Sequence, residues 1–182
     1  MTVVVTTKRG AVAEEATAQL LREVLEQHDA SPWQFTDRVV IDERAIPHSH
    51  PVLTLSTRFL LRTPDGVLAS YLHEQIHWQL VAQRRQVRAA RRDLKALFPT
   101  VPNRAGGGAK TRRSTYLHLL VNWLEVNALT QLAGDDVGES FLDVTVDGPV
   151  YGWVYRQVRD RRPELGKIIT EHELLGPLTG RL

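Results

Sequence analysis

Residues 71–80 read YLHEQIHWQL and place three ionisable side chains, His73, Glu74 and His77, in an otherwise apolar segment. Apolar residues recur at every fourth position over residues 68–80, which predicts a packed α-helix. Burying an unpaired polar or charged group is unfavourable by roughly several kcal/mol. The predicted helix therefore needs partners for these three side chains.

The spacing of the two histidines predicts a metal site. Residues four apart on a helix lie on one face, so His73 and His77 can bind the same ion. Glu74 lies a further ~100° round the helix axis, too far to be a third ligand. It is placed instead to take a proton from a water that the metal activates. The pattern HExxH therefore predicts a Zn²⁺ site with Glu74 as the general base.

HEQIH at residues 73–77, on an apolar helix that follows a predicted strand, resembles the active-site helix of the zincin metallopeptidases. The resemblance covers the motif and its flanks, and elsewhere only the order of the elements. It implies an α+β fold in which a small mixed sheet packs on the HExxH helix and a mostly helical half follows. It also implies that Val52–Leu61 is an edge strand that pairs antiparallel with a peptide substrate.

A catalytic zinc takes three protein ligands and keeps one open position. The residues after His77, WQLVAQRRQ, contain no third histidine, and the chain has no cysteine, so the metzincin and peptide deformylase patterns do not fit. A later segment, STYLHLLVNWLEVNALTQL, carries His118, Asn122 and Glu125 on one face of a predicted helix. The third ligand is expected from this face.

Gluzincins take a glutamate from a later helix, so the resemblance implies that Glu125 is the third ligand, in a gluzincin-like arrangement. A buried isolated carboxylate is also harder to explain than a buried neutral imidazole. His118 is the alternative, and because the two are about 10 Å apart along the axis they should not both bind one ion. His118 or Asn122 would then orient a ligand or contact substrate. A solvent-facing polar stripe is the other interpretation of Asn122.

The expected reaction is hydrolysis of a peptide bond, with a peptide or protein as the substrate. A donor should stabilise the oxyanion that forms on the carbonyl. Tyr155 is the predicted catalytic donor, and Tyr151 and His172 are alternatives by residue type and position. His48 and His50, in the turn PHSHP, are interpreted as rim or structural histidines rather than ligands.

One zincin-like domain is predicted over residues 1–182. Strands are expected at Thr2–Thr7, Phe35–Asp42, Val52–Leu61 and, as a short one, Phe141–Val146. Helices are expected at Ala13–His28, from Val67 towards Pro99 as one or two helices, from Ser114 to Gly134, and at Pro149–Arg161 and Pro163–Leu175. Residues 99–113, PTVPNRAGGGAKTRR, predict a mobile surface loop.

The composition is that of a globular protein, with 182 residues, 42% hydrophobic and 24% charged. The absence of cysteine excludes disulfides and thiolate ligands, and the cytoplasm is the expected compartment. No segment approaches the roughly 20 apolar residues of a membrane span, so no membrane partner is expected.

The arginine-rich run QRRQVRAARRD at residues 83–93 is typical of a solvated helix face, and less often of a nucleic-acid-binding surface. It leaves open a second class of function, a non-enzymatic nucleic-acid-associated or regulatory protein with a structural or degenerate HExxH site. Glu74 discriminates between the two, because a purely structural site does not need it. A metal-dependent hydrolase of non-peptide amides is a third possibility.

Overall fold

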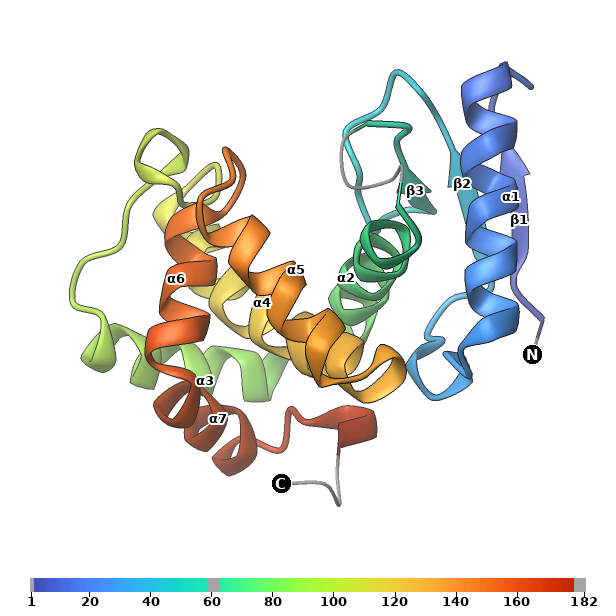
Figure 1. Ribbon diagram of the computed structural model, residues 1–182. Coiled ribbons are helices and arrows are strands. Elements are labelled where there is room, and N and C mark those ends of the chain that lie inside the picture. Colours follow the sequence, from blue (N-terminus) through green and yellow to red (C-terminus); the bar gives the residue numbers. More distant parts are fainter. Residues whose placement is uncertain (1, 59–62, 179–182) are drawn as a thin grey trace.

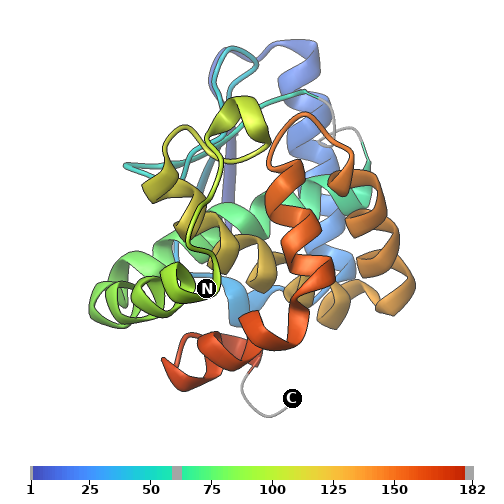
Figure 2. The same cartoon turned by 90° about the vertical axis from the view of Figure 1, so that its left-hand side faces the viewer.

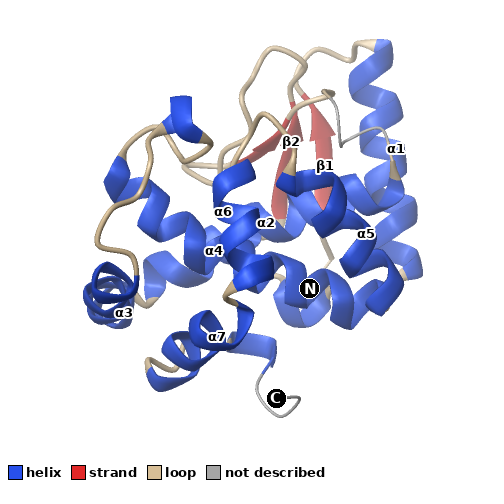
Figure 3. Cartoon of the chain, turned by 60° about the vertical axis from the view of Figure 1, so that its left-hand side comes forward, coloured by secondary structure: helices blue, strands red, loops and turns tan. Residues whose placement is uncertain are grey.

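A computed structural model describes residues 2–58 and 63–178 of the chain. The fold is α+β and mostly helical, with a three-stranded sheet on one side and the helices of the second half on the other (Figures 1 and 3). The strands are β1 (Val4–Thr7), β2 (Arg38–Ile41) and β3 (Leu53–Leu55), in the order β1-β2-β3. Each is short and rich in β-branched or leucine side chains, as predicted.

All three strands are parallel, so the mixed sheet expected from the zincin resemblance is wrong for the described residues. The reason lies in the connections. Helix α1 (Val12–Gln27) crosses between β1 and β2 and packs on both strands, which returns the chain in the same direction. Strands β2 and β3 are parallel as well, so no pair of neighbouring strands in the described sheet forms an antiparallel hairpin.

The strand predicted at Val52–Leu61 is shorter, because β3 ends at Leu55, and the end of the prediction lies outside the described residues. Its outer edge is paired at Thr54, whose N–H donates to His48 O at 2.8 Å while His48 N–H donates to Thr54 O at 3.0 Å. The chain itself therefore covers part of the edge that was expected to receive a substrate strand.

The central helix of the fold is α2 (Pro64–Ala82), which packs against β3, α1 and α4. It begins at Pro64, three residues before the predicted Val67, because Thr63 accepts a hydrogen bond from the Gly66 N–H and Pro64 occupies the first turn. It ends near Gln83, where α3 (Arg84–Leu97) starts in a new direction. The two-helix alternative is thus the correct one for this stretch.

Helix α4 (Arg112–Ala133) lies beside α2 and also contacts α5, α6 and α7. Its start is fixed by a capping box, in which Thr111 Oγ1 accepts from the Ser114 N–H and Ser114 Oγ accepts from the Thr111 N–H, both at 3.1 Å. The last helices are α6 (Gly152–Asp160) and α7 (Arg162–Glu171), close to their predicted positions. Figure 2 shows these helices stacked around α4.

The short strand predicted at Phe141–Val146 is wrong, because these residues belong to helix α5 (Asp135–Val146). Gly134, at φ 99°, ends α4 and allows a new helix to begin at once. Asp135 and Asp136 lie in the first turn, where acidic side chains are favourable. The buried residues Gly138, Phe141, Leu142, Thr145 and Val146 then follow a helical spacing.

The segment predicted as a mobile loop contains a turn of 3₁₀ helix, Arg104–Gly106, and is hydrogen-bonded to its neighbours. Thr115 Oγ1 donates to Pro102 O and accepts from the Ala109 N–H, both at 2.9 Å. Gly107 O accepts from the Trp153 N–H at the start of α6. These bonds connect the loop to α4 and α6, and its mobility stays a prediction.

The buried hydrophobic side chains form one cluster that extends from the sheet through α2 and α4 to α7. Within the described part of the chain, none of the helices combines the length and apolar character that crossing a membrane requires.

Candidate metal centre

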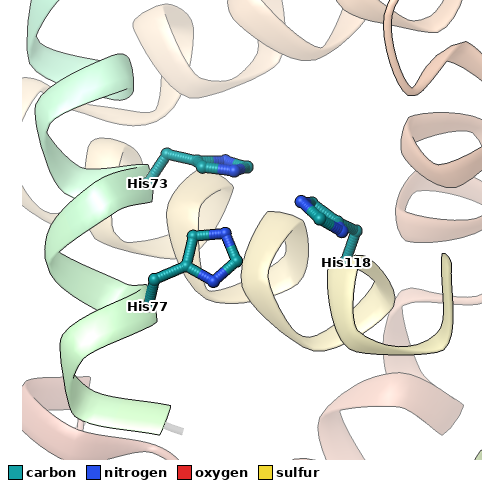
Figure 4. Close-up of side chains that lie close together, drawn as sticks. All are labelled: His73, His77 and His118. Atoms are coloured by element: carbon teal, nitrogen blue, oxygen red, sulfur yellow. The ribbon is translucent and has the colours of Figure 1, made fainter. Parts of the chain in front are cut away.

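The face of α4 that was predicted to supply the third ligand lies next to the HExxH helix α2. Figure 4 shows the rings of His73 and His77, from α2, converging with that of His118, from α4. Each histidine offers one ring nitrogen such that the three atoms lie within 4.8 Å of one another. The ring centroids are 5.0 to 5.5 Å apart. Three imidazoles in this arrangement can hold one metal ion and leave a further position open.

Hydrogen bonds orient two of the three rings. Nδ1 of His73 lies 2.9 Å from Glu125 Oε2, and Nδ1 of His118 lies 2.8 Å from the carbonyl oxygen of Ser114. Both acceptors lack a hydrogen, so each Nδ1 carries the proton and donates. The lone pair is then on Nε2 of each ring, which is the tautomer that a metal ligand needs.

The charge states of His77 and His118 also fit a metal centre. Burial lowers the pKa of His77 to about 2, with the neighbouring histidines acting in the same direction. Burial likewise lowers the pKa of His118 to about 3. Both rings are therefore neutral at ordinary pH, and neutral imidazole is the ligand form. For His73 burial also lowers the pKa, but the carboxylates of Glu125 and, to a smaller extent, Glu74 outweigh it and the net shift is upward.

Glu74, next to His73 on α2, is also buried. Its carboxylate forms no hydrogen bond or ion pair with any residue that the structure describes. Burial raises its pKa, the neighbouring His73 opposes that shift, and the charge of Glu125 adds to it. A raised pKa moves a carboxylate towards the range that suits a general base and acid.

Glu125, the expected third ligand, is positioned differently from that expectation. Its Oε2 accepts hydrogen bonds from Nδ1 of His73 and from the hydroxyl of Tyr155, the latter at 3.0 Å. Among the described residues the potential ligand group contains His118 and does not contain Glu125. Glu125 thus lies behind His73 rather than beside the point where the three rings converge.

Asn122, between His118 and Glu125 on α4, is fully buried, so the solvent-facing interpretation is wrong. Neither its amide nitrogen nor its amide oxygen has a hydrogen-bond partner among the described residues. Its side chain is left with unused donors and an unused acceptor next to the histidine group.

The two tyrosines lie differently with respect to the histidine group. Tyr155 is buried, donates to Glu125, and has a pKa well above its usual value because of burial and that carboxylate. Tyr151 stacks on His118, with ring centroids 4.2 Å apart, and lies close to parallel with His73 at 5.9 Å. His172 bonds to Asp93 at 2.6 Å, between α7 and α3, and is not part of the group.

The turn that contains His48 and His50 is attached to α2 one residue after the motif. Trp78 Nε1 donates to the carbonyl oxygen of Ser49 at 2.9 Å, and the Trp78 ring stacks on His50 at 4.0 Å. Neither histidine belongs to the ligand group in the described structure. The interpretation of a rim or structural turn therefore agrees with these contacts.

The carbonyl oxygen of Ser114, which orients the His118 ring, is not among the residues predicted from the sequence. Ser114 precedes His118 by four residues, and on a helix this spacing places the carbonyl next to the side chain one turn later. The spacing itself was therefore a usable signal.

No family model, curated protein or solved structure matches this chain.

Proposed function

We propose that this protein is a zinc-dependent hydrolase of peptide or related amide bonds, with His73, His77 and His118 as the metal ligands and Glu74 as the general base. The observation that carries the proposal is the convergence of three histidines from two helices, two of them with Nδ1 engaged as a donor and Nε2 left free. A purely structural cluster would not need this common orientation.

The donor set fits zinc. Three imidazoles with one open position are a catalytic zinc arrangement, and the chain has no thiolate that would complete a closed structural site. Zinc, when bound, supplies the Lewis acidity that activates water and polarises a carbonyl. Glu125 is not assigned as a ligand. Instead its carboxylate accepts a hydrogen bond from His73 Nδ1–H, which orients the ring of this ligand and increases its basicity.

Glu74 would move the protons of the reaction. As a carboxylate it takes a proton from the attacking water, and as a carboxylic acid it returns that proton to the leaving amine. Its raised pKa favours the second step more than an ordinary glutamate would. Its freedom from other hydrogen bonds among the described residues leaves both oxygens available for this exchange.

Tyr151 is the better candidate for the oxyanion donor. Burial raises its pKa to about 12, with the carboxylates of Glu74 and Glu125 adding to the shift, so its hydroxyl keeps its proton at neutral pH. Its ring lies on His118, which places the side chain at the histidine group. Tyr155 instead holds Glu125 in place and acts on the centre only through it.

The test compares zinc content and hydrolysis in three proteins purified without added metal: the unchanged chain, Glu74→Gln, and Glu139→Gln as a matched change at an exposed glutamate. All three should contain one equivalent of zinc by mass spectrometry. In a peptide-library assay Glu74→Gln should lower turnover by at least ~10²-fold, and Glu139→Gln should not change it. Absence of bound zinc in the unchanged chain, or equal turnover in the two variants, would overturn the proposal.

A further inference from the structure

Helix α3 is strongly positively charged, unlike the rest of the molecule taken together. It contains six basic residues and one acid, which give it a formal charge of +5, whereas the whole chain has +2 and the remaining residues therefore sum to −3. Helix α3 is therefore strongly basic, whereas the rest of the chain is weakly acidic overall. Helix α3 lies at the outer side of the molecule, away from the sheet (Figures 2 and 3).

The six cations share one side of the helix. At ~100° per residue they fall within a sector of about 120°, and the buried side chains Val87, Ala90 and Leu94 lie on a different side. Arg113, at the start of α4, extends the patch, because its charge acts on Arg91 together with that of Arg88. We call this set the basic surface: Arg84, Arg85, Arg88, Arg91, Arg92, Lys95 and Arg113.

The basic surface has no anionic counterpart within the described residues. None of its seven side chains forms an ion pair with a carboxylate there. The one acid of α3, Asp93, bonds to His172 instead. Arginines elsewhere in the chain do find partners, as Arg161 does with Glu164 at 2.7 Å. Such a run of like charges without partners repels itself and favours an anion from outside.

We propose that the basic surface binds the phosphate backbone of double-stranded DNA. Fourteen residues of helix extend about 21 Å, which allows the row of cations to follow a series of phosphates. Six of the seven are arginines, whose planar guanidinium groups bind phosphate in a bidentate manner. The interaction is with the backbone and is independent of base sequence.

Two other anionic partners fit the basic surface less well. Single-stranded nucleic acid is usually held by aromatic side chains on which bases stack, and α3 contains none. A membrane-surface helix inserts large apolar side chains between the lipid headgroups. The large hydrophobic residues of α3 face the core, and none of its described residues is an exposed large hydrophobic.

The test measures binding of a fluorescein-labelled DNA duplex of about 20 base pairs by fluorescence anisotropy, at salt concentrations from about 50 to about 200 mM. The unchanged chain should bind with an affinity that falls steeply as salt increases. Arg88→Gln combined with Arg92→Gln should weaken binding at the lowest salt by on the order of tenfold for each charge removed, and should reduce the slope of log K against log salt by about 2.

The matched control combines Arg38→Gln with Arg44→Gln, which removes the same net charge from exposed positions outside the basic surface. It should leave affinity and slope nearly unchanged, and thermal melting should confirm that both double variants fold. Equal losses in the two double variants, no binding by the unchanged chain at low salt, or tighter binding to polyglutamate or to phosphatidylserine vesicles than to the duplex would each overturn the proposal. Glu74→Gln should bind DNA normally, so this result is independent of hydrolysis.

Discussion

The carboxylate of Glu125 joins His73 to Tyr155: its Oε2 lies 2.9 Å from Nδ1 of His73 and 3.0 Å from the Tyr155 hydroxyl. The three residues come from α2, α4 and α6, so the chain of hydrogen bonds connects three separate helices. Because both donors meet one oxygen atom, Glu125 fixes the orientation of the His73 ring from behind. It thereby leaves Nε2 of His73 free of this hydrogen bond.

Glu125→Gln should weaken zinc binding without abolishing it. The amide keeps the size of the side chain but removes the charge that stabilises the His73 proton, and loss of such a partner usually lowers metal affinity about 10- to 100-fold. Chelator competition measures the change. Tyr155→Phe, which removes only the outer hydrogen bond, should have a smaller effect. Complete loss of zinc from Glu125→Gln would instead identify Glu125 as a ligand.

His118→Ala should abolish stable zinc binding, because it removes one of the three converging nitrogens and leaves only the pair on α2. Zinc content after dialysis against a weak chelator measures the loss. His172→Ala is the matched control, since His172 bonds to Asp93 outside the histidine group. A His118→Ala protein that retained one equivalent of zinc would exclude His118 from the ligand set.

Tyr151→Phe should lower kcat by about 10²- to 10³-fold, the usual cost of removing one oxyanion donor. KM and zinc content should stay close to those of the unchanged chain, because phenylalanine preserves the ring that stacks on His118. The control is Tyr71→Phe, which removes a buried hydroxyl from α2 that has no partner among the described residues. An equal loss of kcat in both variants would mean that the Tyr151 hydroxyl has no specific role.

Glu14→Gln should destabilise the fold in a pH-dependent manner. Glu14 accepts hydrogen bonds from the backbone N–H groups of Arg9 and Glu43, at 2.7 and 3.1 Å, and these bonds lower its pKa although burial opposes them. Its contribution is therefore present above the ordinary pKa of 4.5 and is lost as pH falls through the lowered value.

Thermal denaturation followed by circular dichroism checks this sign. The melting temperature of Glu14→Gln should be lower than that of the unchanged chain at pH 7, and the two should approach each other below the ordinary glutamate pKa. Glu15→Gln changes a neighbouring exposed glutamate and should have little effect at any pH. A difference between Glu14→Gln and the unchanged chain that grew on acidification would contradict the prediction.

The proximity of His73 and His77 follows from the local sequence alone. Their relationship depends only on the rise and turn of one helix, which the local pattern and the Thr63 cap specify. The same local geometry put His118, Asn122 and Glu125 on one face of α4. What it could not supply was the position of that face relative to α2.

In the structure His118, and not Glu125, belongs to the group that contains the two motif histidines. His118 and Glu125 are separated by about 10 Å along one helix, so the axial position of α4 against α2 determines which of them meets the two motif histidines. That position results from many apolar contacts across the interface, and no single spacing in the sequence encodes it. Strand direction and the conformation of Phe141–Val146 were decided in the same way. A short apolar segment is compatible with a helix or a strand, and a strand with a parallel or an antiparallel neighbour. Long-range packing selects one of these alternatives.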